Sequence, residues 1–147
     1  MRRVIFLDFD GVLAPIRRWD RYGELEPVCI QVLNEIVTRA DADVVVSSTW
    51  RHGKTVAELQ AMLAALGFTG FVLDKTPTVE PSADRGDEIS AWLAAHEVKS
   101  YVIIDDHSVG ELRARLVLTH PARGLQPADA RRAIAILMRP ANGGPPC

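Results

Sequence analysis

Short apolar runs alternate along the chain with longer segments in which apolar residues recur at helical spacing. The short runs predict strands, and because they are apolar throughout we expect both of their faces to be covered, as in a parallel sheet. These strands are predicted at residues 3–7, 44–46, 71–73, 101–104 and 116–118. The longer segments predict amphipathic helices. They are 27–41, 55–67, a segment with Ile89, Trp92, Leu93 and His96 on one face, and 127–138.

The alternation of strands and helices predicts the fold class. Strands separated by helical segments of about ten to fifteen residues indicate a parallel sheet with helices on both faces. We therefore expect an α/β, three-layer fold with a five-stranded parallel sheet. No internal repeat or linker divides the sequence, so one domain is expected over residues 1–139. The Pro- and Gly-rich end, 140–147, is expected to be a disordered tail.

Three of the predicted strands end in polar side chains rather than in ordinary turns. The residues are Asp8 and Asp10, Ser47 and Ser48, and Asp105 and Asp106. A strand has no structural reason to end in an acid, because burying an unpaired carboxylate costs several kcal/mol. In parallel sheets, ligands bind outside the carboxyl ends of the strands. We therefore expect these side chains to form one shared site, which the chain leaves by a sharp turn at Gly11.

Carboxylates and hydroxyls of this kind favour phosphoryl chemistry with a metal ion. Hard oxygen ligands select Mg²⁺ over softer metals. An aspartate can attack phosphorus to form an aspartyl-phosphate, and a second acid can protonate the leaving oxygen and then deprotonate the hydrolytic water. A receiver-type signalling domain also has acids at strand ends. It is disfavoured because it would carry the adjacent acid pair on the first strand, the reverse of the order found here.

Composition and charge narrow the function classes further. The 147 residues suit one domain with a full core, and a net charge of -2 argues against broad, non-specific affinity for nucleic acid. The apolar start before Asp8 is too short for a signal peptide or a membrane span. Cys29 and Cys147 offer neither a disulfide framework nor metal-ligand spacing. We expect a reduced, cytoplasmic protein without membrane contact, and the sequence identifies no partner chain.

Four segments resemble, in order, the motifs of the haloacid dehalogenase (HAD) superfamily of phosphatases. They are Asp8-Phe9-Asp10-Gly11-Val12-Leu13, Val46-Ser47-Ser48, Arg85 and Ile104-Asp105-Asp106. Longer strings are similar to the small HAD domains of Swiss Army Knife RNA-repair proteins. They are Ser47-Ser48-Thr49-Trp50-Arg51, Thr76-Pro77, Arg85-Gly86-Asp87-Glu88-Ile89 with Trp92-Leu93, and Gly124-Leu125. The resemblance covers residues 3 to 138. It implies a HAD-like Rossmannoid fold and a Mg²⁺-dependent phosphatase that acts through an aspartyl-phosphate.

The resemblance also implies roles for individual residues. Asp8 would be the nucleophile and Asp10 the general acid/base. Relatives that displace halide usually lack the second acid, so a phosphatase is favoured over a dehalogenase. Ser47 would bind the phosphoryl oxygens, with Ser48 as the alternative within the pair.

The metal site and the third motif follow from the same resemblance. The Mg²⁺ ligands would be Asp8, the backbone carbonyl of Asp10, and one of the pair Asp105–Asp106. The family usually has a lysine at the third motif, where this chain has Arg85. Lys75 is the alternative for that role.

The length of the connections bears on the substrate. HAD relatives that act on small metabolites usually carry a cap domain, and neither 14–26 nor 52–84 leaves room for one. A capless or minimally capped fold has an open mouth, which favours a large substrate such as a polynucleotide end or nucleotide, or a phosphoprotein. Contacts are expected from Arg17, Arg18 and Arg51, which are otherwise ordinary loop residues. A catalytically silent phosphate-binding or regulatory module is the alternative function.

Overall fold

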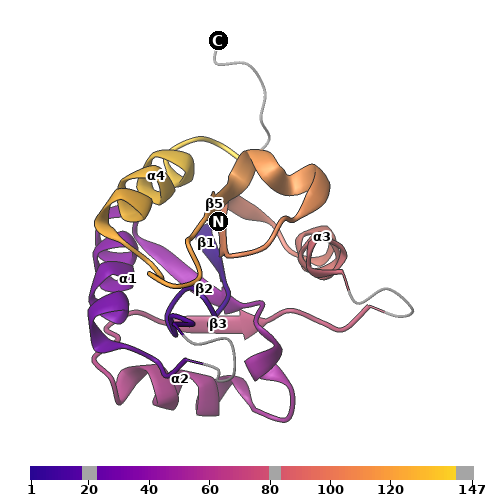
Figure 1. Cartoon of the computed structure of the whole chain (residues 1–147). Coiled ribbons are helices and arrows are strands. Elements are labelled where there is room, and N and C mark those ends of the chain that lie inside the picture. The colour runs from indigo at the N-terminus through magenta and orange to yellow at the C-terminus, as the bar shows by residue number, and fades with distance from the viewer. Residues whose placement is uncertain (18–22, 80–83, 142–147) are drawn as a thin grey trace.

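The computed structural model describes residues 1–17, 23–79 and 84–141 of the chain. Its strands form one parallel sheet of five strands in the order β3-β2-β1-β4-β5 (Figure 1). The strands are β1 (Arg2–Leu7), β2 (Ala42–Val46), β3 (Val72–Lys75), β4 (Val98–Asp105) and β5 (Leu116–Leu118). The predicted α/β fold with a five-stranded parallel sheet is confirmed.

Helices cover both faces of this sheet (Figure 1). On one face lie α1 (Pro27–Ala40), α2 (Val56–Ala64) and α4 (Pro127–Leu137). On the other lie α3 (Arg85–Ala95) and the 3₁₀ helix η2 (Gly110–Arg115). Alternate residues of β1 point to opposite faces of the sheet. Ile5 and Leu7 pack toward α1, whereas Val4 and Phe6 pack toward α3. A second 3₁₀ helix, η1 (Thr49–Arg51), follows β2 directly.

Local sequence explains where several elements begin and end. Pro27 occupies the first turn of α1, where its missing N–H costs no helical hydrogen bond, and Asp41 ends the helix with φ 50. Strand β4 begins at Val98, earlier than the predicted residue 101, because the chain stays paired with β1 through polar residues. The reason is visible at Ser100, which is buried in the strand with its hydroxyl hydrogen-bonded to Arg139 O. A hydrophobic pattern cannot detect a strand residue of that kind.

The chain after α4 stays packed against the sheet for a short distance. Arg115 Nη2 donates to Pro140 O, and Ala141 N donates to Lys99 O at 2.9 Å. The expected tail, 140–147, is therefore bonded over its first two residues, and its remainder, 142–147, lies outside the described residues.

No cap domain interrupts the described part of the chain. Between β1 and α1, residues 8–17 and 23–26 form turns, extended chain and one isolated bridge from Asp10 to Ala14. Between η1 and α3, the described residues hold only α2 and β3. None of the described loops beyond the carboxyl ends of the strands therefore holds a folded cap. Among the same residues, no helix has the length and apolarity needed to cross a membrane.

Candidate active site

The loops that carry the expected site residues meet where the strand order reverses. The chain passes from β1 to β2 on one side, while β4 pairs with β1 on the other, so the carboxyl ends of β1 and β4 lie at the topological switch point, where open α/β sheets bind ligands. Asp8 and Ser47 directly follow β1 and β2, and Asp105 ends β4. Asp8 N donates to Ile104 O at 3.1 Å, and Ser47 N donates to Leu7 O at 3.0 Å. The sheet therefore delivers the three polar side chains at the same level.

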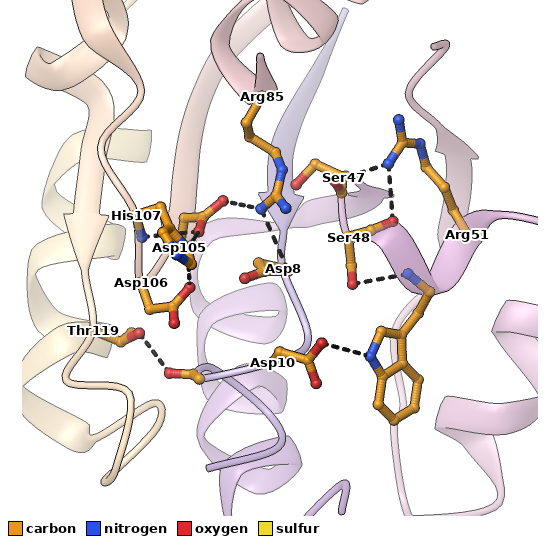
Figure 2. Close-up of polar contacts among 12 residues, drawn as sticks. Asp8, Asp10, Ser47, Ser48, Arg51, Arg85, Asp105, Asp106, His107 and Thr119 are labelled. Carbon is orange, nitrogen blue, oxygen red and sulfur yellow. Dashed lines mark hydrogen bonds and ion pairs between the residues drawn. The ribbon is translucent and has the colours of Figure 1, made fainter. Parts of the chain in front are cut away.

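Three carboxylates and one imidazole converge at this edge (Figure 2). Asp8, Asp105, Asp106 and His107 each offer one ligand atom, and these atoms lie within 4.8 Å of one another. The carboxylates of Asp8, Asp105 and Asp106 are almost fully buried. A divalent cation would offset their mutual repulsion, and carboxylate oxygens are the ligands that Mg²⁺ prefers. The residues present therefore fit a magnesium site.

His107 belongs to this group although the sequence did not place it there. Its Nδ1 lies 2.7 Å from Asp106 Oδ1, while 75% of its side chain is exposed. Its backbone N donates to Asp105 Oδ1 at 3.0 Å. The only signal in the sequence is its place directly after the acid pair, where a solvated loop residue is equally ordinary.

Burial and charge make the ionised form of the acids costly. Loss of hydration, followed by repulsion from Asp105, raises the pKa of Asp8 to about 8. Burial likewise raises the pKa of Asp105. Arg85 opposes both shifts, because its Nη1 pairs with Asp105 Oδ2 and lies 3.4 Å from Asp8 Oδ1. Burial lowers the pKa of Arg85, but Asp105 and Asp8 outweigh burial, so its pKa is raised overall and it stays charged.

Gly11 makes room for Asp106. Its φ is +78, and a Cβ at this position would overlap the Asp106 carboxylate. The turn is fixed from the far side by Thr119, whose buried hydroxyl donates to Gly11 O at 2.7 Å (Figure 2). Thr119 directly follows β5, so its signal in the sequence was a polar residue at the end of a fourth predicted strand.

The Asp10 carboxylate lies outside the group formed by Asp8, Asp105, Asp106 and His107. Its Oδ2 accepts a hydrogen bond from Trp50 Nε1 at 3.0 Å, and Figure 2 shows the carboxylate turned toward that indole. Its Oδ1 is buried and has no hydrogen-bond partner in the described part of the chain. A metal contact by Asp10 would therefore come from its backbone carbonyl, as the resemblance implies. Hydrophobic patterning gave no reason to pair Trp50 with Asp10.

The two serines after β2 differ in what their hydroxyls do. Ser48 Oγ accepts from Trp50 N at 3.2 Å and so caps η1. Ser47 Oγ is buried and makes no hydrogen bond to any described residue. In Figure 2, Ser47 lies beside Arg85 and Asp8. A buried hydroxyl without a hydrogen-bond partner costs free energy. Of the two serines, Ser47 is therefore the one whose hydroxyl is available to donate a hydrogen bond to a ligand oxygen.

The Arg51 side chain is buried and does not line the opening of the candidate active site. Only 3% of its side chain is exposed, and its guanidinium has an acceptor for each of its five N–H donors. The acceptors are the carbonyl oxygens of Ser47, Ser48, Thr76 and Pro77, and Oε2 of Glu88 at 2.8 Å. The expectation of a substrate contact from Arg51 does not fit this geometry, because no donor is left. Sequence reasoning also missed Glu88, a buried acid one turn into α3.

The remaining expected cations are placed differently. Lys75 Nζ donates to the carbonyl oxygens of Lys54 and Arg51, at 2.6 and 3.3 Å, so it is Arg85 and not Lys75 that contacts the acids. Arg17 is exposed and pairs with Glu26. Arg18 lies outside the described residues.

Comparison with known protein families gives a match that covers most of the chain. The family described as the HAD domain in Swiss Army Knife RNA repair proteins matches residues 4–130. No curated protein and no solved structure matched. The matched segment runs from β1 into α4 and includes every acid, serine and arginine described at the site. The chain therefore belongs to the family of HAD domains of Swiss Army Knife RNA repair proteins.

Proposed function

We propose that this protein is a metal-dependent phosphomonoester hydrolase that works through an aspartyl-phosphate on Asp8. The observation that carries the proposal is the convergence of three buried carboxylates beside Arg85 and the unpartnered hydroxyl of Ser47. Membership of the HAD family supports the same chemistry. A catalytically silent module is disfavoured, because each acid of the motifs is present and lies at the carboxyl edge of the sheet.

The metal would be Mg²⁺, held by Asp8, by the Asp105–Asp106 pair and by the backbone carbonyl of Asp10. When bound, it would offset the negative charge of the carboxylates and of the phosphoryl group. Ser47 Oγ would donate to one phosphoryl oxygen. Arg85, already between Asp8 and Asp105, would neutralise charge at the same group.

In the first step, a carboxylate oxygen of Asp8 attacks phosphorus and the P–O bond to the leaving group breaks. Asp10 donates a proton to the leaving oxygen, so that an alcohol departs and not an alkoxide. In the second step, water attacks the phosphorus of the aspartyl-phosphate, and Asp10 takes up the proton that this water loses. Inorganic phosphate departs, Asp8 is regenerated as a carboxylate, and Asp10 is again protonated for the next cycle.

The nucleophile is tested by Asp8→Asn, which preserves size but removes the attacking carboxylate. We expect phosphate release by the wild-type protein with Mg²⁺, none with chelator, and a loss of at least about a thousandfold in the variant, the scale expected when a nucleophile is removed. Acid-quenched protein should carry phosphate on Asp8 in the wild type alone. A variant that keeps more than about a thousandth of the turnover would refute the covalent role.

The substrate that we propose is the phosphorylated end of a nucleic acid. The RNA-repair family supports this class, and the lack of a cap among the described residues supports a substrate too large to be enclosed. The net charge of -2 requires that affinity come from local cations. Arg17 is the described candidate, and it would have to exchange Glu26 for a phosphate.

A further inference from the structure

We propose that Trp50 is a positioning residue for proton transfer: its indole N–H holds Asp10 so that Oδ1 is the oxygen that carries the proton. This inference rests on the proposed function, because it concerns the acid/base of that reaction. It assigns a role to a residue that the sequence singled out only as part of the string Ser47-Ser48-Thr49-Trp50-Arg51.

The contact is specific to one atom of each side chain. Trp50 Nε1 donates to Asp10 Oδ2 at 3.0 Å, as Figure 2 shows. The indole ring also packs edge-on against the buried Phe9, with ring centroids 5.4 Å apart and an interplanar angle of 69°. Packing therefore fixes the plane of the indole ring, and the hydrogen bond fixes the carboxylate relative to that plane.

The backbone that carries the indole is itself held in place. Trp50 N donates to the capping hydroxyl of Ser48, and Arg51 binds the carbonyl oxygens of both serines. Arg51 also pairs with Glu88 of α3, so η1 is tied to the opposite layer of the fold. The indole is thus positioned by the loop after β2, whereas Asp10 is positioned by the loop after β1.

Hydrogen-bond donor and acceptor rules then determine which oxygen is protonated. A neutral carboxylic acid has one O–H donor and one oxygen that only accepts, and an indole N–H can only donate. The oxygen that faces Trp50 must therefore be the acceptor, so the proton of neutral Asp10 resides on Oδ1. Oδ1 is therefore the oxygen of Asp10 that can donate a proton to a leaving oxygen, while Oδ2 accepts from the indole.

The surroundings of Oδ1 agree with the assignment of the proton to Oδ1 and of the indole contact to Oδ2. Oδ1 is buried and accepts no hydrogen bond from any described residue, so no donor in the described part of the chain competes with a leaving oxygen or a water for it. The Asp10 carboxylate also lies outside the ligand group formed by Asp8, Asp105, Asp106 and His107. The Trp50 contact therefore keeps the proton carrier separate from the carboxylates that would hold a cation.

The test compares two tryptophans that make the same kind of contact in different places. Trp50→Phe keeps an aromatic ring against Phe9 but removes the N–H. The matched control is Trp92→Phe, because Trp92 Nε1 donates to Asp74 Oδ2 at 2.8 Å and its ring packs edge-on against Phe6. General acid catalysis is worth about 10²- to 10⁴-fold and matters most for poor leaving groups. We expect Trp50→Phe to lower turnover of an alkyl phosphate about tenfold or more, and of an activated aryl phosphate less than about threefold.

The control should leave the ratio of the two rates unchanged. Equal losses on both substrates in Trp50→Phe, or the same change of ratio in Trp92→Phe, would overturn the role of Trp50 while the proposed function stood. A wild-type protein that releases phosphate from neither substrate would overturn the proposed function and this role with it.

A readout that does not depend on activity tests the contact itself. The ¹H–¹⁵N indole signal that disappears in Trp50→Phe identifies Trp50. We expect this signal to move upfield in Asp10→Ala, because its acceptor is gone, while the Trp92 signal stays in place. An unmoved Trp50 signal would overturn the inference.

Discussion

Asp8 is a buried carboxylate whose neighbours determine how the protein responds to pH. Its pKa in the folded protein is about 8, raised by burial and by Asp105 from its ordinary value of 3.8, while Arg85 partly opposes the shift. Asp106 and His107 complete the titratable surroundings. The folded state thus binds one more proton at Asp8 than the unfolded state does between these two values. The contribution of Asp8 to stability is therefore present below about pH 4 and is lost as the pH rises to about 8.

The corresponding prediction concerns the protein in chelator. Its free energy of unfolding should fall as the pH rises from about 4 to about 8, with at most about 1.4 kcal/mol per pH unit from Asp8. Mg²⁺ should restore stability at high pH, because a bound cation favours ionised Asp8. Urea unfolding of the wild type and Asp8→Asn across this range measures the difference. Parallel curves for the two proteins would show that Asp8 does not titrate in this way.

Single residues also show how far the sequence could predict the site. Asp8, Asp105 and the serines were identified because an acid or hydroxyl after an apolar strand points to an edge where ligands bind. Arg51 was assigned to substrate because an arginine after a strand looks the same whether it faces solvent or buried carbonyls. The Trp50–Asp10 contact was missed because it depends on how two loops approach each other.

At the scale of elements, η1 joins the sheet to α3 through one buried guanidinium. Arg51 pairs with Glu88, with the carbonyl oxygens of Ser47 and Ser48 after β2, and with that of Thr76 after β3. The helices and strands themselves were largely predictable from periodicity, as at α1 and β1. The 3₁₀ helix η1 was not predictable, because three residues are too few to show a hydrophobic period. Its backbone is held by the hydrogen bonds of Arg51 to Ser47 O and Ser48 O.

Arg51→Lys should therefore destabilise the fold without adding a clash. Lysine has three donors and no planar fork, so carbonyl oxygens and the Glu88 carboxylate lose partners in a buried place. We expect a loss of about 3 kcal/mol in the free energy of unfolding, measured with denaturant. The control is Arg39→Lys, since Arg39 is exposed and pairs only along α1 with Glu35, and it should change stability by less than about 0.5 kcal/mol. A similar effect of the two substitutions would contradict the structural role of Arg51.

At the scale of the whole molecule, the substrate that we propose would supply its own cover, because no cap domain lies among the described residues around the acids. The expectation of a capless fold came from segment lengths alone. Which surface a polymer would follow could not be predicted, because that depends on side-chain pairs such as Arg17 with Glu26. The net charge of the chain carries no information about such local pairs.

Charge reversal at Arg17 tests the polymer substrate. Arg17→Glu should lower kcat/KM several-fold on an oligonucleotide with a terminal phosphate and reduce the slope of its salt dependence by about 0.7 to 0.9, the contribution of one phosphate contact. Turnover of a small aryl phosphate should not change. Arg39→Glu is the matched control, because Arg39 is also exposed and paired with a glutamate but lies at the far end of α1. If Arg17→Glu affected both substrates equally, or if Arg39→Glu had the same effect as Arg17→Glu, the proposed contact between Arg17 and a polymer substrate would be contradicted.

The central position of β1 in the sheet means that the candidate site stays intact when the outer strands open locally. β1 is paired on both edges and covered on both faces, so its carboxyl end cannot move unless the sheet itself comes apart. The outer strands β3 and β5 each have one paired neighbour and can detach at lower cost. The proposed nucleophile, Asp8, is therefore attached to the part of the protein expected to open last, and brief fraying of the outer strands leaves it in place.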